Sequence, residues 1–165
     1  MRKRLLLAVA ALLPAAAVAQ EAPVVEHQPA LCTVPDQPLS LCAAISDDGS
    51  VATSRLYFRR AGQDFYAFVD MAFTGVGYCG TVPAPRARTK AIEYYVQAVD
   101  DSYQPTRTST YRIPVQLEGI CEFPPLEKDR AKASTIRVFA TNKKQGRKLD
   151  GGFVAAGVTF VPATN

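Results

Sequence analysis

The chain has 165 residues, is 48% hydrophobic and carries 19 Lys and Arg against 15 Asp and Glu. This length suits one domain with its own core rather than several domains. Three of the basic residues and none of the acidic ones lie in the first 19 positions, so removing that segment would leave 16 against 15, a net charge of +1. A nearly neutral domain argues against a broad positive surface for nucleic acid, and we expect no nucleic-acid partner.

Residues 1–19 have the pattern of a secretory signal peptide. Three basic residues precede an apolar run from Leu5 to Val18, which ends in the small-residue pattern of residues 17–19. The run is short for a membrane span, and no cysteine follows the expected cleavage site, so we expect neither a transmembrane span nor a lipid anchor. The sequence therefore predicts a secreted or periplasmic protein whose mature chain begins with a flexible arm at residues 20–26.

Four cysteines remain in the mature chain, at positions 32, 42, 79 and 121. An even number in an oxidising compartment indicates two disulfides, whereas zinc would need close Cys pairs and more histidines than the single His27. We therefore expect no metal. Three pairings are open, and one is favoured because Cys32 and Cys42 are equidistant from Gln37 in a turn-rich segment. A hairpin there would pair Cys32 with Cys42 and leave Cys79 with Cys121.

Short segments with two-residue alternation follow one another, separated by turn signals, and no helical period appears. The predicted strands are 39–46, 54–60, 64–74, 78–82, 91–101 and 108–117. Such spacing favours an all-β sandwich of about seven strands. The clearest alternation lies in 91–101, whose inward set is Ile92, Tyr94, Val96 and Ala98.

The order Tyr-x-Val-x-Ala-Val-Asp at 94–100 resembles strand F of a bacterial fibronectin type III or immunoglobulin-like extracytoplasmic module. The ordered segments SLCAAISDDG, ATSRLYFRR, YCGTVPAP and RTSTYRIPV extend the resemblance, which implies a sandwich over residues 27–121. It also implies that Tyr94 turns inward and bonds its hydroxyl to nearby backbone. Modules of this kind mostly act as spacers, adhesive surfaces or adaptors, so the resemblance implies a binding role.

The composition changes after Cys121. Residues 122–132 read as a Pro-rich and charged linker, and the apolar segments within 133–162 predict a C-terminal β-hairpin. A lone hairpin is only marginally stable, so we expect it to pack on the sandwich, extend one of its sheets or pair with another chain. The loop between its strands would present four basic residues to an anionic partner or simply to solvent: Lys143, Lys144, Arg147 and Lys148.

Two further groups of side chains are candidate sites. The outward face of strands 54–60 and 91–101 carries a mixture of arginine and tyrosine typical of contact surfaces, comprising Arg55, Tyr57, Arg59 and Tyr95. Cross-strand pairing, or a floor for the C-terminal hairpin, would explain the same residues. At one end of the sandwich, two acidic pairs form either ordinary turns or a calcium site, and these are Asp47, Asp48, Asp100 and Asp101.

Residues for catalysis are scarce. The chain has no Gly-X-Ser-X-Gly elbow and a single histidine, which we expect to lie in the N-terminal arm. We therefore expect a non-enzymatic binding or adaptor module of the cell envelope, without a cofactor, whose partner is a protein or an envelope surface component. The alternative is a structural or assembly subunit whose C-terminal hairpin pairs with a neighbouring chain.

Overall fold

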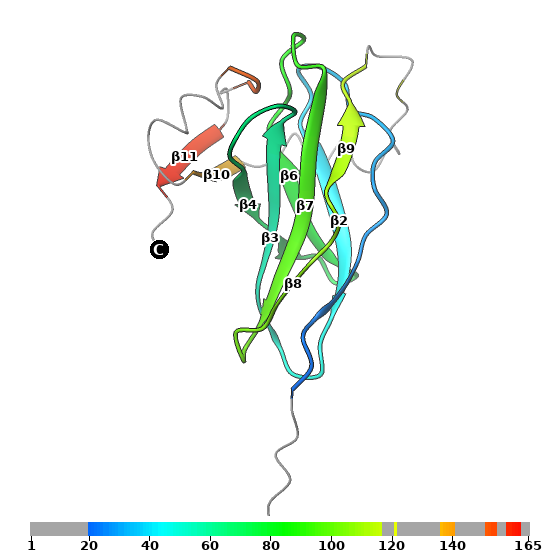
Figure 1. Ribbon diagram of the computed structural model, residues 1–165, viewed down its shortest axis with the longest axis vertical. Coiled ribbons are helices and arrows are strands. Elements are labelled where there is room, and N and C mark those ends of the chain that lie inside the picture. Colours follow the sequence, from blue (N-terminus) through cyan, green and yellow to red (C-terminus); the bar gives the residue numbers. More distant parts are fainter. Residues whose placement is uncertain (1–19, 117–120, 122–135, 141–150, 155–157, 163–165) are drawn as a thin grey trace, which may run out of the picture.

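The computed structural model of the protein describes residues 20–116, 121, 136–140, 151–154 and 158–162 (Figure 1). This part of the chain is all-β and contains no helix. In chain order its strands are β1 (Val24–Glu26), β2 (Leu39–Ser46), β3 (Val51–Arg60), β4 (Ala67–Asp70), β5 (Ala72–Phe73), β6 (Tyr78–Val82), β7 (Ala91–Asp100), β8 (Pro105–Arg107), β9 (Tyr111–Pro114), β10 (Ile136–Ala140) and β11 (Val158–Pro162). Strands β2 and β6 have the bounds that the sequence predicts.

The strands form two sheets that pack face to face, so the predicted β-sandwich is confirmed. A four-stranded sheet has the order β1-β2-β6-β5, and a seven-stranded sheet has the order β11-β10-β4-β3-β7-β8, with β9 also paired to β7. The long β3–β7 pair forms the middle of the second sheet and lies over β2 and β6 (Figure 1).

The core forms where the inward faces of the two sheets meet. The predicted inward set of β7, from Ile92 to Ala98, is fully buried, as are Leu56 and Phe58 of β3. Opposite them lie Leu39, Leu41 and Val82 of the four-stranded sheet. Each large apolar side chain removed from water contributes about 1.5–3 kcal/mol, which drives the sheets together without the tryptophan that many such cores contain.

The predicted strand 64–74 is divided between the two sheets. Ala67, Val69 and Met71 keep the buried alternation, and the Met71 amide still donates to the Ser54 carbonyl of β3. The next two residues then pair with β6 as strand β5. The chain therefore crosses from one sheet to the other at Met71. The apolar alternation of the sequence continues to Phe73, which is why the sequence pattern does not reveal the crossing, although Ala72 and Phe73 are both exposed in β5.

Of the predicted strand 108–117, the structure keeps only β9, and a further short strand, β8, precedes the predicted range. Strand β8 pairs with the end of β7 and β9 with its beginning. Between them, the Thr108 hydroxyl accepts a hydrogen bond from the Val96 amide, which occupies a ladder position in place of a backbone carbonyl. A side chain that substitutes for the backbone in this way interrupts a strand.

The disulfide pairing differs from the predicted one: Cys42 is bonded to Cys79, and Cys32 to Cys121. Cys42 and Cys79 are opposite each other in the β2–β6 ladder. The predicted Cys32–Cys42 hairpin does not form, because β1 pairs with β2 only as far as Glu26. Residues after Glu26 leave that sheet, and Thr33 bonds to the backbone of Pro114 and Gln116, on the segment that leads to Cys121.

The predicted flexible arm is also corrected. Residues 24–26 form β1 in register with the end of β2, and Gln20 bonds to the side chains of Asp101 and Ser102 at the end of β7. The start of the described chain is thus part of the sandwich.

The C-terminal strands do not form the predicted hairpin, because β10 and β11 pair in parallel. Strand β10 adds antiparallel to β4 through the pair Phe139 and Phe68, so these strands extend the seven-stranded sheet. Parallel pairing requires a long connection, and part of that connection, residues 151–154, forms a bridge with the β6–β7 loop. The predicted linker 122–132 and the basic loop from Lys143 to Lys148 lie outside the described residues.

Candidate binding face on the seven-stranded sheet

Four aromatic side chains form one continuous row across the outward face of the seven-stranded sheet. Tyr57 of β3 lies opposite both Tyr95 of β7 and Phe68 of β4, and Phe68 lies opposite Phe139 of β10. The ring centroids are 4.8 Å apart for Tyr57 and Tyr95, 5.3 Å for Tyr57 and Phe68, and 4.9 Å for Phe68 and Phe139. All four are partly exposed, because their neighbours along each strand fill the core.

Arginine side chains cover the aromatic rings. The guanidinium carbon of Arg55 lies 4.5 Å from the Phe68 centroid, and that of Arg59 lies 4.3 Å from Tyr66. Arg107 and Arg137 lie at 5.3 Å and 5.6 Å from Tyr95 and Phe139. Such cation–π contacts contribute roughly 0.5–1 kcal/mol each at exposed sites. The arginine–aromatic face is defined here as Arg55, Tyr57, Arg59, Tyr66, Phe68, Tyr95, Arg107, Arg137 and Phe139.

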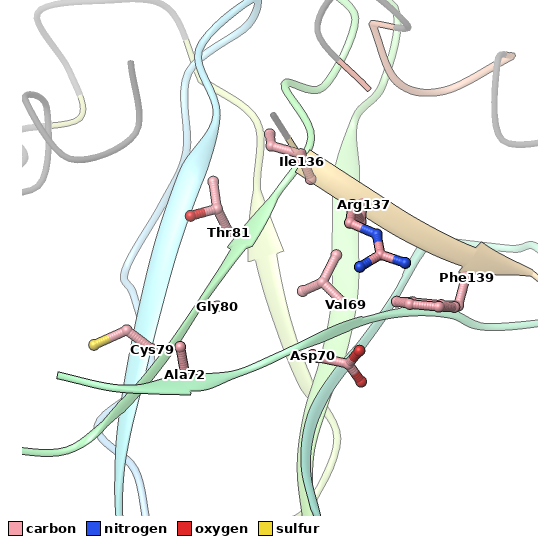
Figure 2. Close-up of a pocket in the computed structure, with 9 residues that line it drawn as sticks. All are labelled: Val69, Asp70, Ala72, Cys79, Gly80, Thr81, Ile136, Arg137 and Phe139. Carbon is pink, nitrogen blue, oxygen red and sulfur yellow. The ribbon is translucent and has the colours of Figure 1, made fainter. Parts of the chain in front are cut away.

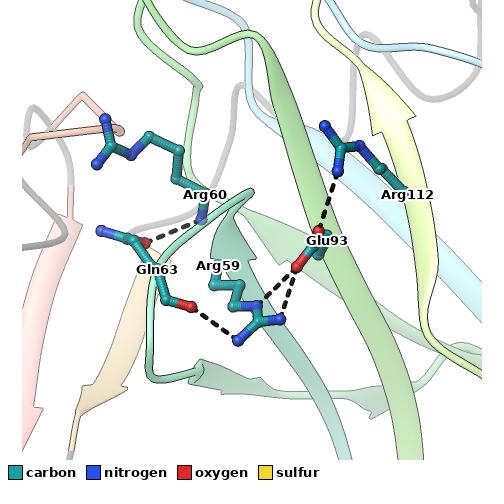
Figure 3. Close-up of polar contacts among 5 residues, drawn as sticks. All are labelled: Arg59, Arg60, Gln63, Glu93 and Arg112. Atoms are coloured by element: carbon teal, nitrogen blue, oxygen red, sulfur yellow. Dashed lines mark hydrogen bonds and ion pairs between the residues drawn. The ribbon is translucent and has the colours of Figure 1, made fainter.

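Arg59 is held by the densest set of polar contacts on this face (Figure 3). Its Nε and Nη2 atoms each lie 2.8 Å from Oε2 of Glu93, and its Nη1 donates to the carbonyl of Gln63 at 2.7 Å. Arg112 approaches the other oxygen of Glu93 at 3.5 Å. The Arg59 and Glu93 side chains are only 25% and 14% exposed. These contacts therefore fix the Arg59 side chain in the orientation in which its guanidinium group lies over the Tyr66 ring.

The other arginines are held less firmly. Arg55 Nε lies 3.4 Å from Asp70 Oδ1, without hydrogen-bond geometry, and these side chains are 40% and 60% exposed. Water screens such a pair, so it contributes little. Within the described ranges, Arg107 and Arg137 have no carboxylate at ion-pair distance. These two arginines, on β8 and β10, carry positive charge that the face does not neutralise.

The environment of Tyr95 disfavours ionisation of its phenol group. Burial raises the pKa of Tyr95, and the neighbouring Tyr57 raises it further, while Arg107 opposes the shift. Tyr57 and Tyr95 cover one face of each other's ring, since the two planes differ by only 8°. Ring edges, phenol hydroxyls and guanidinium groups therefore remain for an external contact. These groups donate hydrogen bonds and contribute apolar area, which are the properties of a contact surface.

A cleft of about 290 Å³ opens beside this face, where β10 passes the β4–β5 crossing and β6 (Figure 2). Val69, Gly80 and Ile136 line its apolar part, and Arg137 points toward Val69 and Asp70. A Cβ at position 80 would lie 3.0 Å from Cγ of Met71 and 3.3 Å from Cγ2 of Val69, so a larger residue there would have to displace these side chains. The cleft is small and continuous with the arginine–aromatic face through Arg137.

The two acidic pairs do meet at one end of the sandwich. The Asp101 amide donates to the Ser50 carbonyl, and its carboxylate accepts from Gln20 and Ser50. These hydrogen bonds lower the pKa of Asp101. Asp47 accepts from the Gly49 amide and Asp100 from the Gln104 amide, at 3.0 Å and 2.6 Å. They serve as turn formers, and across the described residues no three His, Cys, Asp or Glu side chains are grouped to hold a metal.

The structure thus brings Arg55, Tyr57, Arg59 and Tyr95 together as one surface and adds residues that the sequence reasoning missed. The missing ones come from β4, β8 and β10, in particular Phe68, Arg107 and Phe139. Alternation places Phe68 and Phe139 on the outward face of their strands, whereas Arg107 lies outside the predicted strands, and only the strand order shows that the three are neighbours. The described C-terminal strands β10 and β11 do not lie over the face, where one prediction from the sequence placed them, but extend its sheet sideways.

No protein-family model matches the chain, and no curated protein matches it. The role of the arginine–aromatic face has therefore to be inferred from its own geometry. In the part of the chain that the structure describes, no helix is long and apolar enough to cross a membrane.

Proposed function

We propose that this protein is a non-enzymatic, extracytoplasmic binding module and that the arginine–aromatic face is its contact surface. The observation that carries the proposal is the aromatic row from Tyr95 to Phe139, which crosses four strands and carries two arginines, Arg107 and Arg137, that lack a carboxylate among the described residues. Tyrosine and arginine are the residues most enriched at the energetic centres of protein interfaces. We expect the partner to be a protein of the envelope.

Pre-organisation supports the same proposal. The stacked rings and the Arg59 contacts with Glu93 and Gln63 hold these side chains in place before any partner arrives. Ordering a side chain on association costs about 0.5–1.5 kcal/mol, so a face that is already ordered loses less on binding. A purely structural stack would also order these groups, but it would not need the charges of Arg107 and Arg137.

We also propose that the protein works outside the cytoplasm and that its domain is an immunoglobulin or fibronectin type III module. Both disulfides suit an oxidising compartment, and residues 1–19 have the pattern of a signal peptide. Strands β2 and β6 share one sheet and β3 and β7 the other, an arrangement that agrees with an immunoglobulin or fibronectin type III module.

Site-specific photo-crosslinking in the native host tests the proposal. A photoreactive phenylalanine analogue placed at Gln97, which lies between Arg55 and Arg107 in register, should capture a defined partner. The same analogue at exposed Ala44, on the four-stranded sheet, is the matched control. The Arg107→Ser/Arg137→Ser variant should reduce capture severalfold without a change in melting temperature. Equal capture at Gln97 and Ala44, or none at Gln97, would refute the proposed surface.

A second candidate function is assembly through strand β11. In the described residues this strand stands at the edge of its sheet and pairs only with β10. Exposed edges are templates for a strand of another chain. Light scattering of the full mature protein and of a variant that ends at residue 157 tests this: assembly predicts an oligomer that the truncation abolishes. A monomer at all concentrations would exclude it and leave the binding-module proposal intact.

A further inference from the structure

The Cys42–Cys79 disulfide lies on the outward side of the four-stranded sheet. Its two residues are directly opposed in the β2–β6 ladder, with Cα atoms 4.1 Å apart. Their neighbours Leu41, Ala43 and Gly80 are buried, so the disulfide must face away from the core. In this disulfide Cys42 is exposed and Cys79 partly exposed, whereas in the other one Cys32 is partly exposed and Cys121 is only 6% exposed. The two disulfides therefore differ in their access to solvent.

The strands joined by this disulfide do not depend on it for their pairing. The β2–β6 ladder runs over five pairs, from Leu39 opposite Val82 to Ala43 opposite Tyr78. Leu39, Leu41 and Val82 anchor the same strands in the core. The segments joined by the Cys32–Cys121 disulfide have less backbone pairing, because Thr33 and Val115 form only an isolated bridge. Reduction of Cys42–Cys79 should consequently leave the sandwich in place.

Among the described residues, the exposed Cys42 side chain gives solvent access to this disulfide. Beyond β6 lies only the two-residue edge strand β5, which places the Thr74 hydroxyl 3.8 Å from Sγ of Cys79. The Cys79 sulfur points away from Val69 and Phe139, out of the cleft (Figure 2). An attacking thiolate needs such access along with a leaving group that can depart.

We propose that Cys42–Cys79 is a thiol–disulfide exchange site whose reductant is a dithiol. One thiolate of the dithiol attacks Sγ of Cys42, the more exposed sulfur, and the Cys42–Cys79 bond breaks as Cys79 leaves as a thiolate and takes up a proton. The second thiol of the dithiol loses its proton and attacks the mixed disulfide, which releases Cys42. Two electrons pass to the protein, and the dithiol ends as a disulfide.

Graded reduction of the folded, oxidised mature protein with dithiothreitol tests the proposal. Free thiols are blocked with iodoacetamide, the remaining disulfides are then reduced and labelled with N-ethylmaleimide, and peptides are mapped by mass. Cys42 and Cys79 should be labelled with iodoacetamide at a dithiothreitol concentration at least about tenfold below that needed to label Cys32 and Cys121. The near-ultraviolet circular dichroism should not change at that concentration.

The proposal is overturned if both disulfides open together, if Cys32–Cys121 opens first, or if opening coincides with loss of the near-ultraviolet signal. The Cys42→Ser/Cys79→Ser variant is the matched control. It should fold with the same near-ultraviolet spectrum and keep Cys32–Cys121 closed at the lower dithiothreitol concentration. Failure of this variant to fold would show that the disulfide is needed for stability, which contradicts an exchange role.

Discussion

Tyr94 joins the N-terminal segment to the core of the sandwich. The resemblance implies an inward tyrosine that bonds to backbone, and Tyr94 is fully buried with its hydroxyl accepting from the Ala30 amide at 3.2 Å. The bonded residue is 64 positions away rather than close in the chain. The hydroxyl also lies 3.0 Å from Nε2 of His27, whose Nδ1 lies 2.7 Å from the Cys42 carbonyl. Since a carbonyl only accepts, Nδ1 carries the proton and Nε2 accepts from Tyr94.

Replacing Tyr94 with Phe tests this junction. The substitution leaves the Ala30 amide and the His27 ring without their partner, so we expect the free energy of unfolding to fall by about 1–3 kcal/mol. Burial is the main reason that the pKa of Tyr94 is raised to about 12, so the phenol is neutral at any ordinary pH. Tyr111→Phe is the control, because its hydroxyl has no hydrogen-bond partner among the described residues. Urea unfolding that shows equal losses in both variants would contradict the assignment.

His27 should make stability depend on pH. Burial lowers the pKa of His27 below its ordinary value of 6.5, and the bond to Cys42 only partly offsets this. Below pH 6.5 the His27 imidazole binds a proton more readily in the unfolded chain than in the folded one. The free energy of unfolding therefore decreases as the pH falls through this range. Above it, the histidine has no effect. Urea unfolding at pH 7.5 and 5.5 should show the decrease, and His27→Gln should reduce it. An equal pH dependence in both proteins would refute this role.

At the scale of the elements, the β3–β7 pair carries the strongest polar contact of the arginine–aromatic face. Arg59→Met removes two bonds to Glu93. The Glu93 side chain, which is only 14% exposed, then lacks its main partner. We expect a loss of about 1–2 kcal/mol in the free energy of unfolding, after allowance for solvent screening. Arg55→Met, on the same strand but in a more exposed pair, should cost no more than about 0.5 kcal/mol. Comparable losses in the two variants would mean that the Arg59–Glu93 pair stabilises the fold no more than the exposed Arg55–Asp70 pair does.

Element boundaries show where the sequence pattern is sufficient. Strands β2, β6 and β7 follow from alternation between turn signals, and the predicted bounds are correct or nearly so. The prediction for segment 64–74 fails because the chain changes sheets at Met71 while the apolar alternation of the sequence continues to Phe73, which is exposed. Alternation records which side chains are buried, not which strand accepts the hydrogen bonds.

At the scale of the whole molecule, the C-terminal segments are part of the sandwich. Ile136, Val138 and Phe153 are buried in its core. Phe153 meets Phe58 edge to face at 5.2 Å, and its carbonyl accepts from Nε of Arg86. The adjacent Gly152 carbonyl accepts from the Thr89 hydroxyl at 2.7 Å. Residues 151–154 therefore close the end of the sandwich at the β6–β7 loop.

The Phe153→Ala substitution tests how much the packing of residues 151–154 contributes to the free energy of unfolding. Removal of a fully enclosed ring should lower the free energy of unfolding by about 3–5 kcal/mol. Phe73→Ala, which removes the same ring at a position that is 63% exposed, should change it by less than about 0.5 kcal/mol. The measurement is urea unfolding followed by circular dichroism. A small loss at Phe153 would indicate that the C-terminal segment is not part of the cooperative unit.

The sequence by itself determined the fold class, the inward faces of the main strands and the candidate residues Arg55, Tyr57, Arg59 and Tyr95. These depend on a period of two along each strand, which is a local property. Only the tertiary structure decided that Cys42 pairs with Cys79 and that Phe139 completes the aromatic row. It also decided that β10 and β11 run in parallel. Those features depend on register and strand order between distant segments, and the same alternation is compatible with either direction of pairing.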